Sequence, residues 1–221
     1  MSSVIDSWES QFGGNEEYVK ANKAGFDYDL DVAYRVRVAD AKVTKTKRGD
    51  IQVCLDLQVR EGGAHGEDGD IIGSTKEWLT LPKQATDKEL AKDLVKKITL
   101  RRRDDFQRIL MTQDAKYAIY SSKEERDGKK VYLDPSGNVL TGAVYKEREL
   151  EVNTAVMALC DSLHEMEGQS VPELIGAEFY LVKSPNKKKP EYPYTNIFSS
   201  PPENMPVFGT DSDGVNSSVP F

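Results

Sequence analysis

Two segments near the start of the chain alternate between apolar and polar residues. In residues 32–39, valine and tyrosine at every second position alternate with alanine and with Arg35 and Arg37. Residues 51–60 repeat the pattern with isoleucine, valine and leucine. A period of two is typical of a β-strand with one buried face. We therefore predict two long strands joined by a hairpin turn at residues 47–50, each with a polar face that carries arginines and glutamines.

Three more β-prone segments follow, at residues 74–82, 177–183 and 192–200. Five strands with a helix before the fourth is the order of an OB barrel. The predicted fold class is mainly β with α: a five-stranded OB-type barrel with an inserted helix and β-hairpin arm, and a disordered C-terminal tail.

The region between the third and fourth predicted strands contains helical and hairpin patterns. A capping box at residues 86–89 begins a helical spacing that continues to Leu110, with a break expected near residues 101–103. The turns RDGK and DPSGN within residues 117–148 predict a β-arm or a pair of hairpins. Asn153 is expected to cap a second helix, because apolar residues at helical spacing follow it.

These patterns divide the chain into three parts. Residues 1–25 are polar and predict an N-terminal arm with little regular structure. Residues 26–200 form the predicted OB-fold domain, with residues 84–150 as its insertion. Residues 201–221 are rich in Pro, Ser, Gly and Asp, which predicts a flexible acidic C-terminal tail.

Charge is distributed unevenly along the 221 residues, whose net charge is −7. Residues 76–150 carry 17 basic and 13 acidic groups, whereas both flanking parts are acidic. A basic middle can therefore present a cationic surface within an acidic total.

Signs of catalysis are few. The sequence has no Gly-rich phosphate loop, HExxH or GxSxG motif, so we predict neither an enzyme nor a cofactor. Cys54, Cys160, His65 and His164 are too scattered to predict a zinc site, and two isolated thiols suit a reducing cytosol. No apolar run is long enough to predict a membrane span, and we expect no secretory leader.

The strongest indication of function comes from aromatic residues that are interleaved with lysine and arginine. Single-stranded nucleic acid is bound in this way, with cations along the phosphates and aromatic rings stacked on bases. For each aromatic alone core packing is the simpler expectation, above all for Tyr34 and Trp78. Two basic clusters, KTKR at 45–48 and NKKK at 186–189, fall in the loops with which OB folds bind. The candidate nucleic-acid-binding residues are Arg35, Arg37, Lys45, Lys47, Arg48, Lys76, Trp78, Arg101, Arg102, Arg103, Tyr120, Lys129, Lys130, Tyr132, Lys187, Lys188, Lys189, Tyr192 and Tyr194.

The chain ends in Val219-Pro220-Phe221 after a Gly/Ser/Asn spacer that contains Asp211 and Asp213. This ending resembles the tail of bacterial single-stranded DNA-binding proteins, an acidic stretch followed by Ile-Pro-Phe. Residues 26–82 and 153–200 are similar to a phage OB-fold family of replication and recombination cassettes. The acidic residues are fewer here and separated from the tip, and residues 84–150 match no known pattern.

The resemblance implies a phage single-stranded DNA-binding protein that acts in the cytoplasm of an infected bacterial host. It also implies that the C-terminal tip recruits replication proteins, such as a polymerase, helicase or nuclease, through an apolar pocket with a basic rim. Two alternatives stay open at this point. One is a virion assembly protein with an interlocking β-arm, and the other is a Mg²⁺-dependent nuclease or recombination accessory protein.

Overall fold

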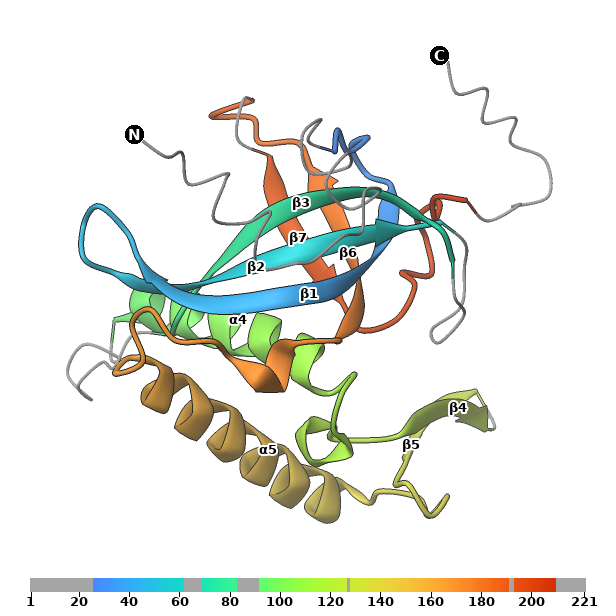
Figure 1. The fold of residues 1–221 in the computed structure, drawn as a ribbon. Helices are drawn as coiled ribbons and strands as arrows, with labels where there is room; N and C mark the ends of the chain where they lie inside the picture. The colour runs from blue at the N-terminus through green and yellow to red at the C-terminus, as the bar shows by residue number, and fades with distance from the viewer. Residues whose placement is uncertain (1–25, 62–68, 83–91, 127, 191–192, 210–221) are drawn as a thin grey trace, which may run out of the picture.

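A computed structural model describes residues 26–61, 69–82, 92–126, 128–190 and 193–209. It is a mixed α+β structure dominated by one antiparallel sheet of five strands, in the order β3-β2-β1-β6-β7. The strands are β1 (Ala33–Lys45), β2 (Ile51–Arg60), β3 (Ile71–Thr80), β6 (Glu178–Ser184) and β7 (Tyr194–Phe198). All five predicted strands are therefore confirmed, and β3 and β7 form the two edges of the sheet (Figure 1).

The predicted alternation holds in β1 and β2, with one irregularity. Tyr34, Val36 and Val38 are buried together with the apolar residues of β2. After Val38 the register with β2 shifts by one residue, so that Ala41 and Val43 continue the same buried face. A β-bulge of this kind bends a strand and increases its twist. It explains how a strand of 13 residues keeps one apolar face while it curves.

The other edge of β1 is covered by two different segments. Its first half pairs with β6, from Ala33 opposite Val182 to Arg37 opposite Glu178. Its second half exchanges backbone hydrogen bonds with residues 168–177, which lead from helix α5 (Gly142–Leu163) into β6 through the short η2 helix (Pro172–Leu174). Both edges of β1 are therefore satisfied along most of its length, as buried backbone groups require.

The sheet curls so that its two edge strands meet through side chains. Thr195 of β7 hydrogen-bonds Glu77 of β3 at 3.3 Å. Lys183 of β6 pairs with the same carboxylate and also donates to the Thr195 hydroxyl at 2.8 Å. No backbone ladder joins β3 to β7 among the described residues, so a closed barrel is not formed there.

Helix α4 (Asp93–Leu110) packs where the curled edges approach, since it contacts β3, β6 and β7. Phe106, Ile109 and Leu110 are fully buried on its sheet-facing side. The break expected at residues 101–103 is wrong, because the helix continues through them. Arginine is a good helix former and gives no reason for a break. The predicted capping box lies outside the described residues.

The hairpin predicted within the insertion is confirmed, as β4 (Ser122–Arg126) paired with β5 (Lys129–Leu133). The single-turn helix η1 (Ala115–Tyr117) precedes it. The second helix, α5 (Gly142–Leu163), packs on α4 and begins well before Asn153. The prediction that the β-arm or hairpins extend to residue 148 is therefore wrong. Ala143, Lys146, Glu147 and Arg148, in the last part of that range, favour a helix.

The first residues of the predicted tail contact the body of the protein. Met205 and Val207 pack on Ala33, Tyr180 and Val182, on the face of the sheet opposite the main core. The Phe208 ring stacks on Tyr34 with 5.0 Å between centroids. Residues 201–209 therefore belong to the folded structure, and the rest of the predicted tail lies outside the described residues, as does the predicted arm at 1–25.

Candidate nucleic-acid interface

Trp78 is the most exposed aromatic residue on the described part of the sheet, with 54% of its surface accessible. It lies on β3 and alternates with Glu77 and Leu79, which point to the interior. The expectation that Trp78 is buried is therefore wrong. In the sheet register it lies opposite Cys54 of β2, which in turn lies opposite Lys42 of β1. The indole thus belongs to a row of cross-strand neighbours that ends at the exposed side chain of Lys42.

Lys76 accompanies Trp78 on the same face of β3. Its ammonium lies 3.2 Å from a carboxylate oxygen of Asp56, and its side chain remains 43% exposed. Burial raises the pKa of Asp56, although Lys76 lowers it. A cation that is paired with Asp56 thus lies on the strand beside an exposed ring, a combination that occurs in proteins that bind single-stranded nucleic acid.

Tyr194 provides a second exposed ring, 47% accessible, at the start of β7. Its neighbour Thr195 contacts Glu77, the neighbour of Trp78. Because successive side chains of a strand point to opposite faces, Trp78 and Tyr194 both point outward on the two sides of this junction. We call the junction between β3 and β7 the seam.

The first basic loop is a well-ordered hairpin turn. Thr46 Oγ1 accepts hydrogen bonds from the backbone N–H groups of Arg48 and Asp50, at 3.2 and 3.1 Å. Gly49 adopts a φ of 87°, which an L-residue rarely tolerates. Lys47 and Arg48 are exposed at its tip, whereas Lys45 pairs with Glu167 at 3.4 Å.

The second basic loop, between β6 and β7, is also shaped by a side chain. Asn186 Oδ1 accepts from the N–H groups of Lys188 and Lys189, at 3.1 and 3.2 Å. Lys187, Lys188 and Lys189 are all exposed. Val182, near the end of β6, lies opposite Ala33 at the start of β1, so the loop after β6 lies toward the start of β1, whereas the first basic loop follows its end.

Arg35 is not available for binding, because only 1% of it is exposed. Its guanidinium donates to the Glu61 carbonyl at 3.3 Å. Gly69 lies so close that a Cβ there would come within 2.5 Å of Arg35 Nη2. The prediction for Arg35 is therefore wrong, since long-range packing covers this end of the polar face. Arg37, two residues on, is partly exposed.

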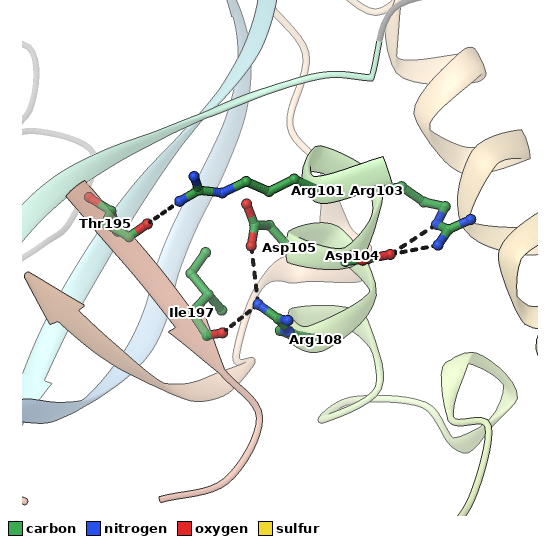
Figure 2. A network of polar contacts seen from close by, with 7 residues as sticks. All are labelled: Arg101, Arg103, Asp104, Asp105, Arg108, Thr195 and Ile197. Carbon is green, nitrogen blue, oxygen red and sulfur yellow. Dashed lines mark hydrogen bonds and ion pairs between the residues drawn. The ribbon is translucent and has the colours of Figure 1, made fainter. Parts of the chain in front are cut away.

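The arginine triplet of α4 is committed to contacts within the protein. Arg101 donates to the Thr195 carbonyl at 3.5 Å and Arg102 to the Leu81 carbonyl at 3.3 Å. Arg103 pairs with Asp104 at 2.7 Å and points away from β7 (Figure 2). The triplet therefore is not a single cationic patch, although Arg101 remains exposed beside the seam.

Sequence reasoning missed two further residues at this helix. Arg108 donates to the Ile197 carbonyl at 3.1 Å and lies 3.5 Å from Asp105, as Figure 2 shows. Burial raises the pKa of Asp105, although the nearby Arg108 and Arg101 lower it. Both residues sit in a run of mixed charge that looks like a solvated face, and only the fold reveals that Arg108 contacts β7 while it pairs with Asp105.

The predicted residues of the insertion form a separate group. Tyr132 contacts the rings of Tyr120 and Tyr145, with centroids 4.7 and 5.2 Å apart. Lys129 and Lys130 are exposed on β5. Figure 1 shows the β4–β5 hairpin projecting away from the five-stranded sheet, so this group is not brought to the seam.

Tyr192 and the tail residues Asp211, Asp213, Val219, Pro220 and Phe221 lie outside the described residues. Within the described ranges, no cluster of His, Cys, Asp and Glu could hold a metal ion, and no helix has the length and apolarity to cross a membrane. Burial raises the pKa of the Cys160 thiol to about 12, and that of Cys54 is raised as well, so both favour the protonated thiol over the nucleophilic thiolate.

Comparison with protein families, with curated proteins and with solved structures finds no match to this chain.

Proposed function

We propose that this protein binds single-stranded DNA across the outer face of β3 and the seam, without catalysis and without a cofactor. The observation that carries the proposal is the exposed Trp78, a large apolar ring held on a strand beside a cation rather than in the core. Tyr194 and the exposed Lys187–Lys189 extend the same combination across the seam. Aromatic stacking supplies about 1–3 kcal/mol per base and tolerates any sequence.

The proposal includes an OB-type fold. Three features support it: the strand order β3-β2-β1-β6-β7, the two helices α4 and α5 between the third and fourth strands of that sheet, and the side-chain contacts that join its edges. OB folds bind with the face of their second and third strands and with the loops after the first and fourth. Trp78 lies on that face, and the two basic clusters lie in those loops.

A role in phage DNA replication or recombination follows as part of the same proposal. It rests on the resemblance of the tail, with Asp211, Asp213 and the tip Val219-Pro220-Phe221 as the partner-binding residues. A terminal Phe with its carboxylate would suit an apolar pocket rimmed by a basic residue on a replication protein.

The test is a fluorescence titration with oligo-dT. The chain has two tryptophans, Trp8 and Trp78, so a Trp8→Phe variant makes Trp78 the only indole reporter. We expect its emission to be quenched, and the affinity to fall steeply with salt because phosphate binding releases counterions.

Trp78→Ala in the full chain should weaken binding by about tenfold, because one stacking contact is lost. A duplex of the same length should bind more weakly than the single strand. Equal affinity for both, or unchanged affinity in Trp78→Ala, would contradict the proposed interface.

A further inference from the structure

A small pocket opens between the edge strands directly beside Trp78. It has a volume of about 170 Å³ and lies between β3 and β7 beneath α4. Its lining includes Trp78, Thr195, Arg102, Asp105 and Phe106. Phe106 is fully buried behind the pocket and offers no free ring face, whereas Trp78 stands exposed. The pocket therefore joins the face proposed to bind the strand.

The size of the pocket limits what it can hold. Pockets for drug-sized ligands measure roughly 300–1,000 Å³, so this one is suited to a single ring rather than to a whole nucleotide. The exposed Trp78 at the pocket favours a planar group, because a flat ring gains most from contact with an aromatic face. A six-membered pyrimidine base meets both requirements better than a two-ring purine.

Two polar groups of the lining come from α4, in addition to Glu77, Thr80 and Thr195 of the edge strands. One Asp105 carboxylate oxygen lies 3.5 Å from Arg108, and the Asp105 side chain is 20% exposed. Arg102 has five N–H donors. Among the described residues, the Leu81 carbonyl is its one hydrogen-bond acceptor, at 3.3 Å. Asp105 and Arg102 lie three residues apart on α4 and thus offer the pocket an acceptor and a set of donors from one face of the helix.

We propose that this pocket binds one cytosine base of a bound single strand, with Asp105 as the acceptor and Arg102 as the donor. This inference rests on the proposed function. A carboxylate accepts well from the N4 amine of cytosine. The neighbouring N3 and O2 of cytosine are acceptors and suit a guanidinium. Thymine carries an oxygen at the position of the amine, which would face the carboxylate as a second acceptor.

The experiment compares the affinities of oligo-dC, oligo-dT and oligo-dA of equal length for the full chain at one salt concentration and neutral pH. We expect oligo-dC to bind about tenfold more tightly than oligo-dT, because one good base contact discriminates by 1–3 kcal/mol. Asp105→Asn should remove this preference, because the amide can donate to O4 of thymine as well as accept from the N4 amine of cytosine. Arg102→Gln should also reduce the preference, and it provides a second variant if Asp105→Asn does not fold.

The matched control is Asp104→Asn. Asp104 also pairs with an arginine of α4, but it is not part of the pocket lining. It should keep the full preference for oligo-dC. Equal wild-type affinity for the three oligonucleotides, or a preference for oligo-dC that survives in Asp105→Asn, would contradict cytosine binding in the pocket. Either result would leave the proposed function standing. Absence of binding to every oligonucleotide would instead overturn the proposed function.

Discussion

Thr195 and Glu77 are joined by a hydrogen bond of 3.3 Å, although their strands are the opposite edges of the sheet. Lys183 completes the link by contacting both side chains. The curled sheet is therefore fastened across its interior by three polar side chains from three strands, where no backbone ladder connects β3 to β7.

Removal of one member of this link should destabilise the protein strongly. Glu77 and Lys183 have side chains that are each only 14% exposed. Glu77→Leu or Lys183→Met alone leaves a largely buried charge without its partner, which costs about 3–5 kcal/mol. The double variant should recover much of this loss. Urea unfolding of the four proteins measures the effect, and single variants within about 0.5 kcal/mol of wild type would contradict it.

Arg108 should stabilise the exposed edge of β7. It donates to the Ile197 carbonyl, so Arg108→Gln should cost about 1.5–3 kcal/mol, as expected for a hydrogen bond to a charged group. The variant should also aggregate more readily, because an uncovered strand edge can pair with another chain. Thermal unfolding and light scattering measure both effects.

Arg103→Gln is the control for this prediction, since Arg103 lies on the same helix and pairs with Asp104 away from β7. It should change stability by less than about 0.5 kcal/mol. Equal losses in the two variants would mean that arginine at this helix stabilises in some other way than by covering the edge.

Asp105 should make the stability depend on pH. Burial raises its pKa above the unfolded value, so the folded state binds its proton more readily than the unfolded chain does. The stabilisation from this proton is complete below the ordinary carboxyl pKa of about 3.9 and is lost as the pH rises through the raised pKa. Asp105→Asn should therefore flatten the change in Tm above about pH 4 and raise Tm at neutral pH.

The comparison needs Tm profiles of wild type, Asp105→Asn and Asp104→Asn. The Asp104 side chain is twice as exposed as that of Asp105, at 40% against 20%, so its variant is the control for loss of a carboxylate from the same helix. A lower neutral-pH Tm in Asp105→Asn would show that its ion pair with Arg108 outweighs the cost of burial.

The basic loops should contribute to DNA affinity without contributing to the fold. Lys47→Glu with Lys188→Glu reverses two exposed charges, so stability should change by under about 0.5 kcal/mol. Affinity for oligo-dT should fall, and its salt dependence should become less steep because fewer counterions are released. If the affinity is unchanged, the strand follows another path, such as the hairpin with Lys129 and Lys130.

The C-terminal tip should act in partner binding. Deletion of Val219–Phe221, or Phe221→Ala, should abolish capture of replication proteins from infected-host lysate, because one aromatic anchor often dominates a small interface. DNA affinity should stay equal or rise slightly. Truncation after Gly209 also removes Asp211 and Asp213 and should raise it further, by an amount that shrinks with salt. The same replication proteins captured by full-length and truncated chains would rule out the tip as a hook.

The five strands could be predicted because each carries an alternating or β-prone pattern that is local in sequence. Arg35 shows the limit of that reasoning. Its place on the polar face follows from the alternation, but its burial depends on Glu61 and Gly69, which reach it only through the fold. The prediction for Trp78 is wrong in the opposite sense. An isolated tryptophan favours a core residue, whereas its position in the strand register places the side chain on the outer face.

The candidate site was predictable in its residue types and its loops rather than in its geometry. The clusters at Lys47–Arg48 and Lys187–Lys189 lie in exposed loops as expected. The arginine triplet reads as a cationic patch in sequence, yet Arg101 and Arg102 bond to backbone carbonyls of other elements. Such contacts join residues far apart in the chain and leave no local pattern.

The return of residues 201–209 to the sheet has a mechanical consequence. Ala33 donates to the Pro206 carbonyl and accepts from the Phe208 N–H, both at 2.9 Å, and Val207 runs parallel to it. A partner that grips the chain beyond Gly209 therefore pulls on the first residue of β1, the central strand of the sheet. Residues 206–208 lie parallel to the start of β1. Tension along the chain therefore acts on both hydrogen bonds and on the Phe208–Tyr34 stack at the same time, along the direction of the strand. The chain end is thus anchored as a tether, and force would reach the middle of the sheet before either edge.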